Sequence, residues 1–354
     1  MSPEQSCRRN MRTVDLRSDT VTIPPKEMLE TIPSARLGDD VYGEDSTVNT
    51  LEEMAAKCFG KQAGLLVTSG TQANTVSLLA QTRPGDAVIL ESECHIFHYE
   101  LGNLATLGGL LPRLVRGELG YPDPKEVEAL IQPETDHTPG TRLICLENTH
   151  NRAGGTVLTP NMMRNIREKA MEHGVPVHLD GARIFNAAIA CGLDVGEFST
   201  YVDTMMFCLS KGLGAPIGSV VLGGHEFIAR ARRIRKMLGG GMRKAGIIAA
   251  PGIYALEHMV DRLREDHENA QLIAQGIRDI PGIRLDMRTV QTNMVKYDVT
   301  GLGLTTQEYI NELGTRGVKV SDIDSYIRVV THYGIDREDV DYAIGIIHDV
   351  TGAK

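Results

Sequence analysis

The sequence predicts an α/β protein with a large domain built on a parallel sheet and a small α+β domain after it. Short continuous apolar runs alternate with helical stretches, which is typical of parallel strands buried on both faces. The chain has 354 residues, 42% of them hydrophobic, so it can bury more than one small core. Pro281-Gly282 ends the last long helical stretch. We therefore expect an N-terminal arm over residues 1–24, a large domain over 25–280 and a small domain over 281–354.

The net charge of −9 and the lack of a basic stripe argue against nucleic acid or an anionic membrane as a partner. The longest apolar stretches have strand length and are interrupted by charges, so no bilayer-spanning segment is expected. Residues 1–12 are polar and carry no apolar signal core. These features predict a cytoplasmic protein that binds a small molecule.

The six cysteines form no Cys-x-x-Cys pair, which predicts neither a disulfide framework nor a zinc site. Two alternatives stay open around one histidine. Cys94 next to His95 could be a thiol nucleophile. His95 and His98 could be ligands of a metal hydrolase, although this spacing alone does not set a ligand geometry. We expect no metal.

The first segments are an extended arm and a capped helix. Residues 13–22 form a polar extended stretch, and Pro24-Pro25 prevents a helix directly after it. Residues 39–45 are rich in turn formers. Ser46 then caps a helix whose apolar positions have helical spacing: Leu51, Met54, Ala55 and Cys58.

Residues 64–74 predict a short buried strand, a turn of small residues and a helix. The turn Ser69-Gly70-Thr71 points backbone N–H groups and a hydroxyl toward one place, which is how a phosphate is held at a helix N-terminus. An ordinary helix cap explains the same pattern. The dinucleotide and P-loop fingerprints are both absent.

Further strands and helices alternate along the large domain. The expected strands are 87–90, 143–146, 175–179 and 204–209, and the expected helices are 161–172 and 183–191. Ligands bind at the carboxyl ends of such parallel strands. Here these ends carry histidines, carboxylates, an arginine and a lysine: residues 91–95, 147–151, 180–183 and 210–211.

Lys211 stands at the mouth of the strand 204–209, before a glycine-rich turn and a further strand at 219–222. Partial desolvation at such a position lowers the pKa of an amine and makes it a nucleophile toward carbonyls. The glycines leave room for a flat group near the backbone. A solvated surface lysine is the alternative.

The rest of the chain predicts helices and then the small domain. A basic amphipathic helix covers 227–238, glycines 239–241 break it, and a helical pattern follows over 243–275 with a break near Asp266. The small domain is expected to contain strands at 283–286, 294–299 and 327–331 and helices at 307–315 and 337–350.

A nucleophilic amine, a phosphate cradle and a carboxylate on the strand between them suggest pyridoxal 5'-phosphate. Lys211 would form the Schiff base, Gly70 and Thr71 would hold the phosphate, and Asp180 would keep the pyridine nitrogen protonated. Asp180 could instead cap the following helix. His178, on the same strand face, could support Asp180.

Several motifs, in order along most of the chain, resemble the low-specificity L-threonine aldolases. They are Asp-Leu-Arg-Ser-Asp-Thr-Val-Thr at 15–22, Gly-Asp-Asp-Val-Tyr-Gly-Glu-Asp at 38–45, Ser-Gly-Thr-Gln-Ala-Asn at 69–74, Glu-Asn-Thr-His-Asn at 147–151, His-Leu-Asp-Gly-Ala-Arg at 178–183, Ser-Lys-Gly-Leu-Gly-Ala-Pro at 210–216 and Lys-Met-Leu-Gly-Gly-Gly-Met-Arg at 236–243. The resemblance implies an aspartate-aminotransferase-like, fold type I architecture with a mostly parallel seven-stranded sheet. It also implies retro-aldol cleavage of L-threonine or L-allo-threonine to glycine and acetaldehyde.

The resemblance implies these roles for individual residues. Lys211 is the Schiff-base lysine, Asp180 faces the pyridine nitrogen, and Ser69, Gly70 and Thr71 form the phosphate cradle. By the same resemblance, His95 stacks on the ring, His150 lies near the substrate hydroxyl, Arg183 lies near the ring oxygen and the substrate carboxylate, and Ser18 and Arg328 bind that carboxylate. His95, His150 or a water held by both is the expected base.

Tyr42, Lys236 and Arg243 match family positions that line the cavity or approach the phosphate across a subunit contact. The resemblance therefore implies a homotetramer, a dimer of dimers with shared sites. Tyr99 and His98 would neighbour the substrate side chain. The sequence departs from its relatives at Lys244 and at Ser92-Glu93-Cys94, which leaves the preferred side chain of the substrate open.

Two other functions remain open. A β-eliminating lyase of the same fold would cleave the Cα–H bond and expel a group from Cβ. A non-catalytic pyridoxal phosphate binding protein would be expected to lose the histidines or Arg328, and all of them are present.

Overall fold

The computed structural model describes residues 12–352, which form two compact units. The larger unit is the continuous segment Ile23–Arg264. The smaller unit combines residues 12–22 with the chain from Glu265 onward. Residues 1–11 of the expected arm, including Cys7, lie outside the described residues.

The division between the units falls before residue 265 and not after 280, where the sequence suggested it. The reason is the long helix α12 (Leu263–Ile277), which the sequence pattern assigned to the large domain. Its apolar side chains Ala270, Ile273 and Ala274 are buried in the core of the smaller unit.

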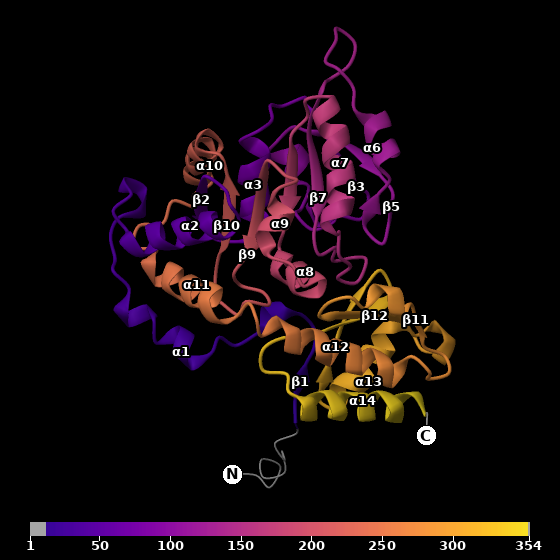
Figure 1. Cartoon of the computed structure of the whole chain (residues 1–354). Coiled ribbons are helices and arrows are strands. Elements are labelled where there is room, and N and C mark those ends of the chain that lie inside the picture. Colours follow the sequence, from indigo (N-terminus) through magenta and orange to yellow (C-terminus); the bar gives the residue numbers. More distant parts are fainter. Residues whose placement is uncertain (1–11, 353–354) are drawn as a thin grey trace. The chain divides into compact units, whose positions relative to one another are not determined.

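A seven-stranded sheet forms the centre of the larger unit, in the order β2-β10-β9-β8-β7-β3-β4 (Figure 1). Four of its pairings are parallel, and only β10 runs antiparallel to its two neighbours. The expected mostly parallel sheet of seven strands is thereby confirmed. The strands are β2 (Ala63–Val67), β3 (Ala87–Glu91), β4 (Leu111–Val115), β7 (Thr141–Glu147), β8 (Val177–Asp180), β9 (Thr204–Cys208) and β10 (Ser219–Gly223).

Helices follow most of these strands, and a two-stranded hairpin of β5 (Gly117–Glu118) and β6 (Tyr121–Pro122) follows β4. The helices of the larger unit are α1 (Lys26–Leu29), α2 (Ser46–Cys58), α3 (Gly70–Leu79), α4 (His95–His98), α5 (Asn103–Thr106), α6 (Pro124–Leu130), α7 (Pro160–Glu172), α8 (Ile184–Cys191), α9 (Val195–Ser199), α10 (His225–Met237) and α11 (Gly246–His258). The helical pattern at 243–275 thus breaks between α11 and α12, a few residues before Asp266.

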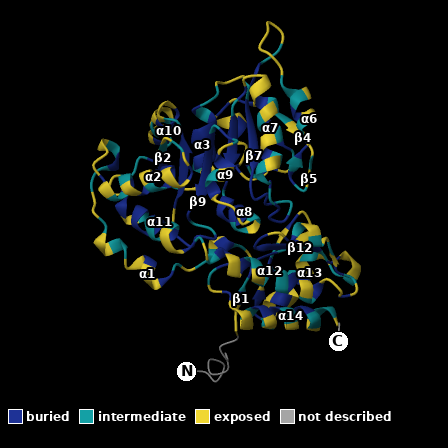
Figure 2. Ribbon diagram, in the orientation of Figure 1, coloured by how far each residue is buried: buried dark blue, intermediate teal, exposed yellow. Residues whose placement is uncertain are grey.

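Side chains alternate along each strand, so each strand directs residues to both faces of the sheet, and both faces are covered by packed side chains. Met206 and Cys208 of β9 belong to an apolar cluster with α3 and α10. Phe207 points to the opposite face, where it stacks on Phe59 at 5.1 Å, directly after α2, and meets Phe185 of α8 edge-on at 5.4 Å. Figure 2 shows the strands buried and the exposed residues on the outer faces of the helices. This burial explains the unbroken apolar runs in the sequence.

The smaller unit contains a four-stranded antiparallel sheet in the order β11-β12-β15-β14. The first described residues also belong to this unit, because β1 (Val14–Asp15) pairs in parallel with β13 (Val318–Lys319) in a separate two-stranded sheet. The other elements are β11 (Arg284–Leu285), β12 (Met294–Asp298), α13 (Thr306–Thr315), β14 (Ser321–Ile323), β15 (Tyr326–Val330) and α14 (Arg337–Thr351). Over residues 12–352, no helix has both the length and the apolar character needed to cross a membrane.

Candidate active site

Three carboxylates end three neighbouring parallel strands. Glu91 is the last residue of β3, Glu147 of β7 and Asp180 of β8. Glu147 and Asp180 pair in register, and all three side chains are buried. The carboxyl ends of parallel strands meet at one edge of a sheet, where ligands bind in open α/β folds. The edge is therefore both buried and strongly charged.

Lys211 follows β9 at this same edge. The loop after it returns through Gly214 and Gly218, whose φ angles of 72° and 112° favour glycine. Within residues 12–352, no hydrogen bond or ion pair reaches the Nζ of Lys211. The amine therefore has its donors available for a ligand.

The first turn of α3 also presents free donors. Ser69 is the N-cap, and its Oγ accepts a hydrogen bond from the backbone N–H of Gln72 at 3.1 Å. This hydroxyl therefore stabilises the first turn of the helix. In the described structure the N–H groups of Gly70 and Thr71 and the Thr71 hydroxyl have no partner. A Cβ on Gly70 would lie 3.0 Å from the Sγ of Cys208, tighter than ordinary contacts. The turn thus has the unpaired donors that an anion would need, close to β9.

Asn74, one turn further along α3, connects two buried carboxylates. Its amide nitrogen donates to Asp180 Oδ2 at 2.8 Å and to Glu100 Oε1 at 2.7 Å. Its Oδ1 lies 3.3 Å from the Nε2 of His178, and the Nδ1 of His178 lies 2.9 Å from the hydroxyl of Thr204. The expected support of Asp180 by His178 is therefore indirect, through Asn74.

Burial lowers the pKa of His178 to about 4, so its ring is neutral near pH 7. Since the amide oxygen of Asn74 can only accept, Nε2 carries the hydrogen and Nδ1 accepts from Thr204. Asp180 also accepts the N–H of Ala182 at 3.1 Å. It does not cap α8, whose N-cap is the buried Arg183.

His95 begins α4, beside the end of β3. Its backbone N–H donates to Glu147 at 2.6 Å, and its Nδ1 lies 3.2 Å from Glu100 Oε1. No partner within the described chain reaches its Nε2. Burial lowers the pKa of His95, but Glu100, Asp180 and Glu147 outweigh burial and the charge of Lys211, so the pKa is raised overall. His95 is thus a basic imidazole with one free ring nitrogen.

His150 has a different environment, although it also follows a strand end. Its Nε2 lies 2.9 Å from Glu91, and its Nδ1 accepts the N–H of Ala153 at 3.2 Å. Only 1% of the side chain is exposed, and Gly120 packs directly against the ring. Both ring nitrogens are therefore engaged, and the structure offers no free nitrogen on His150 for the expected role as a base.

Tyr99 lies beside His95, and His98 is the last residue of the same short helix, α4. The ring of Tyr99 is 5.4 Å from that of His95, and its hydroxyl accepts from Arg152 at 3.2 Å. Arg152 also forms an ion pair with Glu93 at 2.8 Å. His98 instead donates from Nε2 to the carbonyl oxygen of Ser92 at 2.9 Å.

The alternatives raised for Cys94 and for a metal receive no support. Cys94 is buried, and burial raises the pKa of its thiol well above the usual value, so it is no thiolate nucleophile. His98 uses Nε2 for a backbone carbonyl instead of sharing a ligand with His95. His95, Glu100 and Asp180 do place three potential ligand atoms within 4.8 Å of one another. Asn74 lies between the two carboxylates and donates to both.

Ser18 and Arg328 belong to the smaller unit. Ser18 Oγ accepts the N–H of Thr20 at 3.2 Å as the cap of a short 3₁₀ helix. Arg328 projects from β15 and donates to the carbonyl oxygen of Arg17 at 3.2 Å. The two residues are neighbours because the first described segment is part of this unit.

Tyr42, Arg243 and Lys236 gather on the surface of the larger unit. The guanidinium of Arg243 lies 5.9 Å from the centre of the Tyr42 ring and pairs with Asp39 at 2.8 Å. The side chain of Tyr42 is 74% exposed. In the described structure none of the three contacts Lys211, His95 or Asp180.

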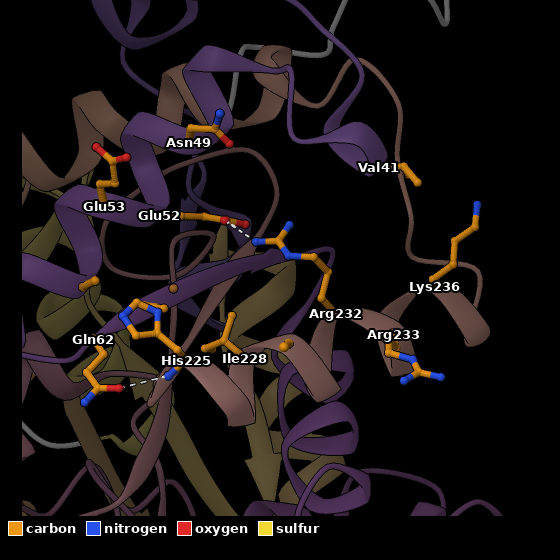
Figure 3. A pocket seen from close by; sticks show the side chains of 14 residues that line it. Val41, Asn49, Glu52, Glu53, Gln62, His225, Ile228, Arg232, Arg233 and Lys236 are labelled. Atoms are coloured by element: carbon orange, nitrogen blue, oxygen red, sulfur yellow. Dashed lines mark hydrogen bonds and ion pairs between the residues drawn. The ribbon is translucent and has the colours of Figure 1, made fainter.

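A cavity of about 830 Å³ lies between α2 and α10 (Figure 3). Glu52 and Arg232 form an ion pair across it at 2.5 Å, and Lys236 stands at its rim. Lys211, His95 and Asp180 do not line it. Its size therefore does not mark the site that the strand ends define.

Sequence reasoning missed Asn74 and Glu100 as site residues. Asn74 closes the motif at 69–74 and lies one helical turn after the cradle, which is a signal that could have been used. Glu100 lies close in sequence to two of its partners, His95 and Asn103, but its contact with Asn74 of α3 arises only through the fold.

Comparison with known proteins shows similarity over almost the whole chain. The model of the beta-eliminating lyase family matches residues 15–300. Low-specificity L-threonine aldolase 1 of Arabidopsis thaliana is 43% identical over 340 residues, covering 94% of this chain and 95% of that protein. The low specificity L-threonine aldolase of Escherichia coli K12 is 41% identical over 328 residues, covering 92% and 95%. The structure of the Leishmania major threonine aldolase superposes with a TM-score of 0.79 at 18% identity, covering 95% and 99%, which supports the fold.

Proposed function

The chain belongs to the beta-eliminating lyase family and, within it, to the low-specificity L-threonine aldolases, and on this basis we propose a reaction and roles for its residues. It is a pyridoxal 5'-phosphate-dependent lyase that cleaves L-threonine or L-allo-threonine to glycine and acetaldehyde. The observation that carries the assignment of residues is the meeting of a free amine, a free imidazole nitrogen and a buried carboxylate at one sheet edge.

The residues at this edge fit the cofactor. Gly70 and Thr71 offer unpaired N–H groups and a hydroxyl where a phosphate needs them, and a larger residue than glycine would crowd the Sγ of Cys208. Lys211 offers an unpaired amine, and Asp180 a carboxylate held by Asn74 and Ala182. When bound, pyridoxal phosphate supplies an aldehyde for the amino group and a ring that withdraws electrons from Cα.

We assign the proton transfer to His95 and not to His150. His95 keeps Nε2 free, while both ring nitrogens of His150 are engaged. Nε2 of His95 takes the proton of the β-hydroxyl, and the electrons of that O–H bond become the second bond of the aldehyde C=O. The electron pair of the broken Cα–Cβ bond remains with Cα, which then receives a proton and leaves as glycine.

Ser18, Arg183 and Arg328 are the proposed ligands of the substrate carboxylate. An arginine fork suits a carboxylate because it can donate two parallel hydrogen bonds. Tyr99 is the proposed neighbour of the substrate side chain, since it lies next to His95 and is held by Arg152.

A homotetramer in the cytoplasm is the proposed state of the protein. Large apolar side chains are exposed on neighbouring parts of the larger unit: Ile23, Leu29, Leu37, Tyr42, Met237 and Ile247. A soluble monomer rarely leaves such a set uncovered. Tyr42, Lys236 and Arg243 belong to the same surface and, in this proposal, complete the site of a neighbouring subunit.

The test is release of acetaldehyde from L-threonine and L-allo-threonine by the purified protein supplied with the cofactor, together with its visible absorbance spectrum. Cleavage of either substrate, and loss of both cleavage and the visible band in Lys211→Ala, would support the proposal. The ratio of the two rates gives the diastereomer preference. Ordinary turnover by Lys211→Ala would refute the role of the lysine, and ammonia with a keto acid in place of acetaldehyde would indicate a β-eliminating lyase.

A further inference from the structure

Glu100 is a buried carboxylate for which the reaction above has no direct use. It follows α4, and its side chain is fully buried. Three side chains contact it: Asn74 at 2.7 Å, Asn103 at 2.8 Å and His95 at 3.2 Å. A carboxylate buried to this degree is retained only where its partners satisfy its charge.

The hydrogens around Glu100 can be assigned one by one. The amide nitrogen of Asn74 faces the carboxylate of Asp180, whose oxygens accept, so the amide oxygen of Asn74 is turned to His178. Both amide hydrogens of Asn74 therefore point to carboxylates, one to Glu100 and one to Asp180.

Asn103 is oriented in the same way. Its amide nitrogen donates to Glu100 Oε2 and to the Oγ1 of Thr75 at 2.9 Å. The hydroxyl of Thr75 in turn donates to the carbonyl oxygen of Thr71 at 2.7 Å, so it accepts from Asn103. Both asparagines thus donate to Glu100. Neither of them offers an oxygen that could accept a hydrogen bond from a protonated Glu100.

Burial and the nearby Asp180 raise the pKa of Glu100 more than its hydrogen bonds to His95 and Asn74 lower it. The donors from both asparagines favour the ionised form, whose oxygens can only accept, so the contact of this form with His95 places a hydrogen on Nδ1. The neutral imidazole then carries its lone pair on Nε2, the nitrogen that has no partner in the described chain. Which nitrogen of a histidine carries the hydrogen is set by the partner of the other nitrogen. Glu100 is the partner that determines the tautomer of His95.

We infer that Glu100 is a positioning residue, which holds His95 as the Nδ1–H tautomer with Nε2 directed to the substrate and which is linked to Asp180 by the amide of Asn74. This inference rests on the proposed function, because it gives His95 the proton transfer. It assigns a role to two residues, Glu100 and Asn74, that lie outside the set expected from the sequence.

The same arrangement sets the basicity of His95. The charged groups around its ring are Glu100, Asp180 and Glu147, which favour the imidazolium, and Lys211, which opposes it. Glu100 is in direct contact, whereas Glu147 accepts from the backbone N–H of His95. Replacing Glu100 by the neutral, similarly shaped glutamine removes the nearest negative charge and keeps the side-chain volume.

The first measurement uses the unaltered protein. With cofactor bound and the histidines labelled with ¹⁵N, the signals of His95, identified by their loss in His95→Gln, should report the Nδ1–H tautomer at high pH. Signals of the Nε2–H tautomer would overturn the inference, and this result requires no substitution of Glu100. This readout does not need turnover, so it decides the question even if threonine is not a substrate.

The second measurement compares Glu100→Gln with Glu126→Gln, a matched loss of charge at an exposed position on α6. In Glu100→Gln the titration of His95 should move down by about one pH unit, the lower end of what a neighbouring charge contributes. The acid limb of the kcat/KM profile should move with it. Glu100→Asp keeps the charge and should restore part of the shift, and Glu126→Gln should leave both curves unchanged. A folded Glu100→Gln with an unchanged titration of His95 would contradict the inference.

Discussion

The ring nitrogens of three histidines have different partners, and these partners decide what each residue can do. His178 donates to Asn74 and accepts from Thr204, so it is a neutral connector. His150 pairs with Glu91 and is closed off from solvent. His95 alone of the three keeps a ring nitrogen without a partner in the described chain. The three side chains are chemically identical, so the differences between them come from their hydrogen-bond partners.

We predict that His95→Asn and His150→Gln have opposite main effects. His95→Asn should lower kcat for threonine cleavage by about a hundredfold, the lower end of what a general base contributes. His150→Gln should mainly lower the free energy of unfolding, by about 2 kcal/mol, because it removes the hydrogen bond that the ring donates to the buried carboxylate of Glu91. Steady-state kinetics and urea unfolding measure the two effects. A stable His150→Gln protein with the larger loss of kcat would show that the roles are reversed.

The neutral His178 predicts a loss of stability in acid. Its pKa in the folded protein is about 4, below the unfolded value of about 6.5, so the unfolded chain binds the extra proton first as the pH falls. The contribution of His178 to the free energy of unfolding is therefore present above pH 6.5 and is lost as the pH falls toward 4. Between pH 7 and pH 5 the loss amounts to about 2 kcal/mol.

Urea unfolding of the wild type and of His178→Gln at pH 7 and pH 5 isolates this contribution. The wild-type protein should lose about 2 kcal/mol more than the variant between the two pH values. Equal losses would mean that His178 does not titrate as its burial implies.

Helix α3 is the element that brings the site together. Its first turn offers the cradle of Gly70 and Thr71, and its next turn places Asn74 against Asp180 and Glu100. Ser69 caps the helix with its own hydroxyl, which leaves the following N–H groups to the ligand. In the proposed roles, a single helix N-terminus therefore binds the phosphate and also contributes Asn74 to the buried hydrogen-bond network.

We predict that Thr71→Ala weakens binding of pyridoxal phosphate to the cofactor-free protein by about tenfold, because a hydrogen bond to a charged group contributes about 1.5 kcal/mol or more. Binding of pyridoxal, which lacks the phosphate, should not change. Titration of the cofactor-free protein by fluorescence measures both affinities. Equal weakening for the two ligands would place Thr71 away from the phosphate.

The sequence was most informative about elements whose pattern is local. The buried strands, the turn at 69–71 and the lysine after β9 were all predicted, because each depends on consecutive residues. The edge strand β4 was missed, since it contains Pro112 and has exposed positions where the inner strands are buried. The order of the strands and the contact of Asn74 with Asp180, 106 positions apart, arise only when the sheet forms. For the same reason the sequence treated His95 and His150 as equivalent.

On the scale of the whole molecule, the exposed apolar surface of the larger unit predicts assembly. Met237 is 71% exposed at the end of α10, and Ile247 is 46% exposed at the start of α11. The double variant Met237→Asp, Ile247→Asp should dissociate the assembly, because it would bury two unpaired charges in a contact.

Light scattering of the purified variant should report a smaller mass than the wild type. The matched control is Met171→Asp on α7, where the side chain is 65% exposed outside this surface. A wild-type protein that is already monomeric, or a double variant with unchanged mass, would contradict the proposed contact.

The pairing of β1 with β13 has a consequence for synthesis on the ribosome. Val14 and Val318 lie side by side although about 300 residues separate them in the chain. At about 5–20 residues per second, the segment at 12–22 emerges on the order of 15 to 60 seconds before its partner strand exists. The larger unit is continuous, so it can fold during that interval. The early segment has to stay unpaired until translation is nearly complete, which makes this small ladder one of the last parts of the nascent protein to form.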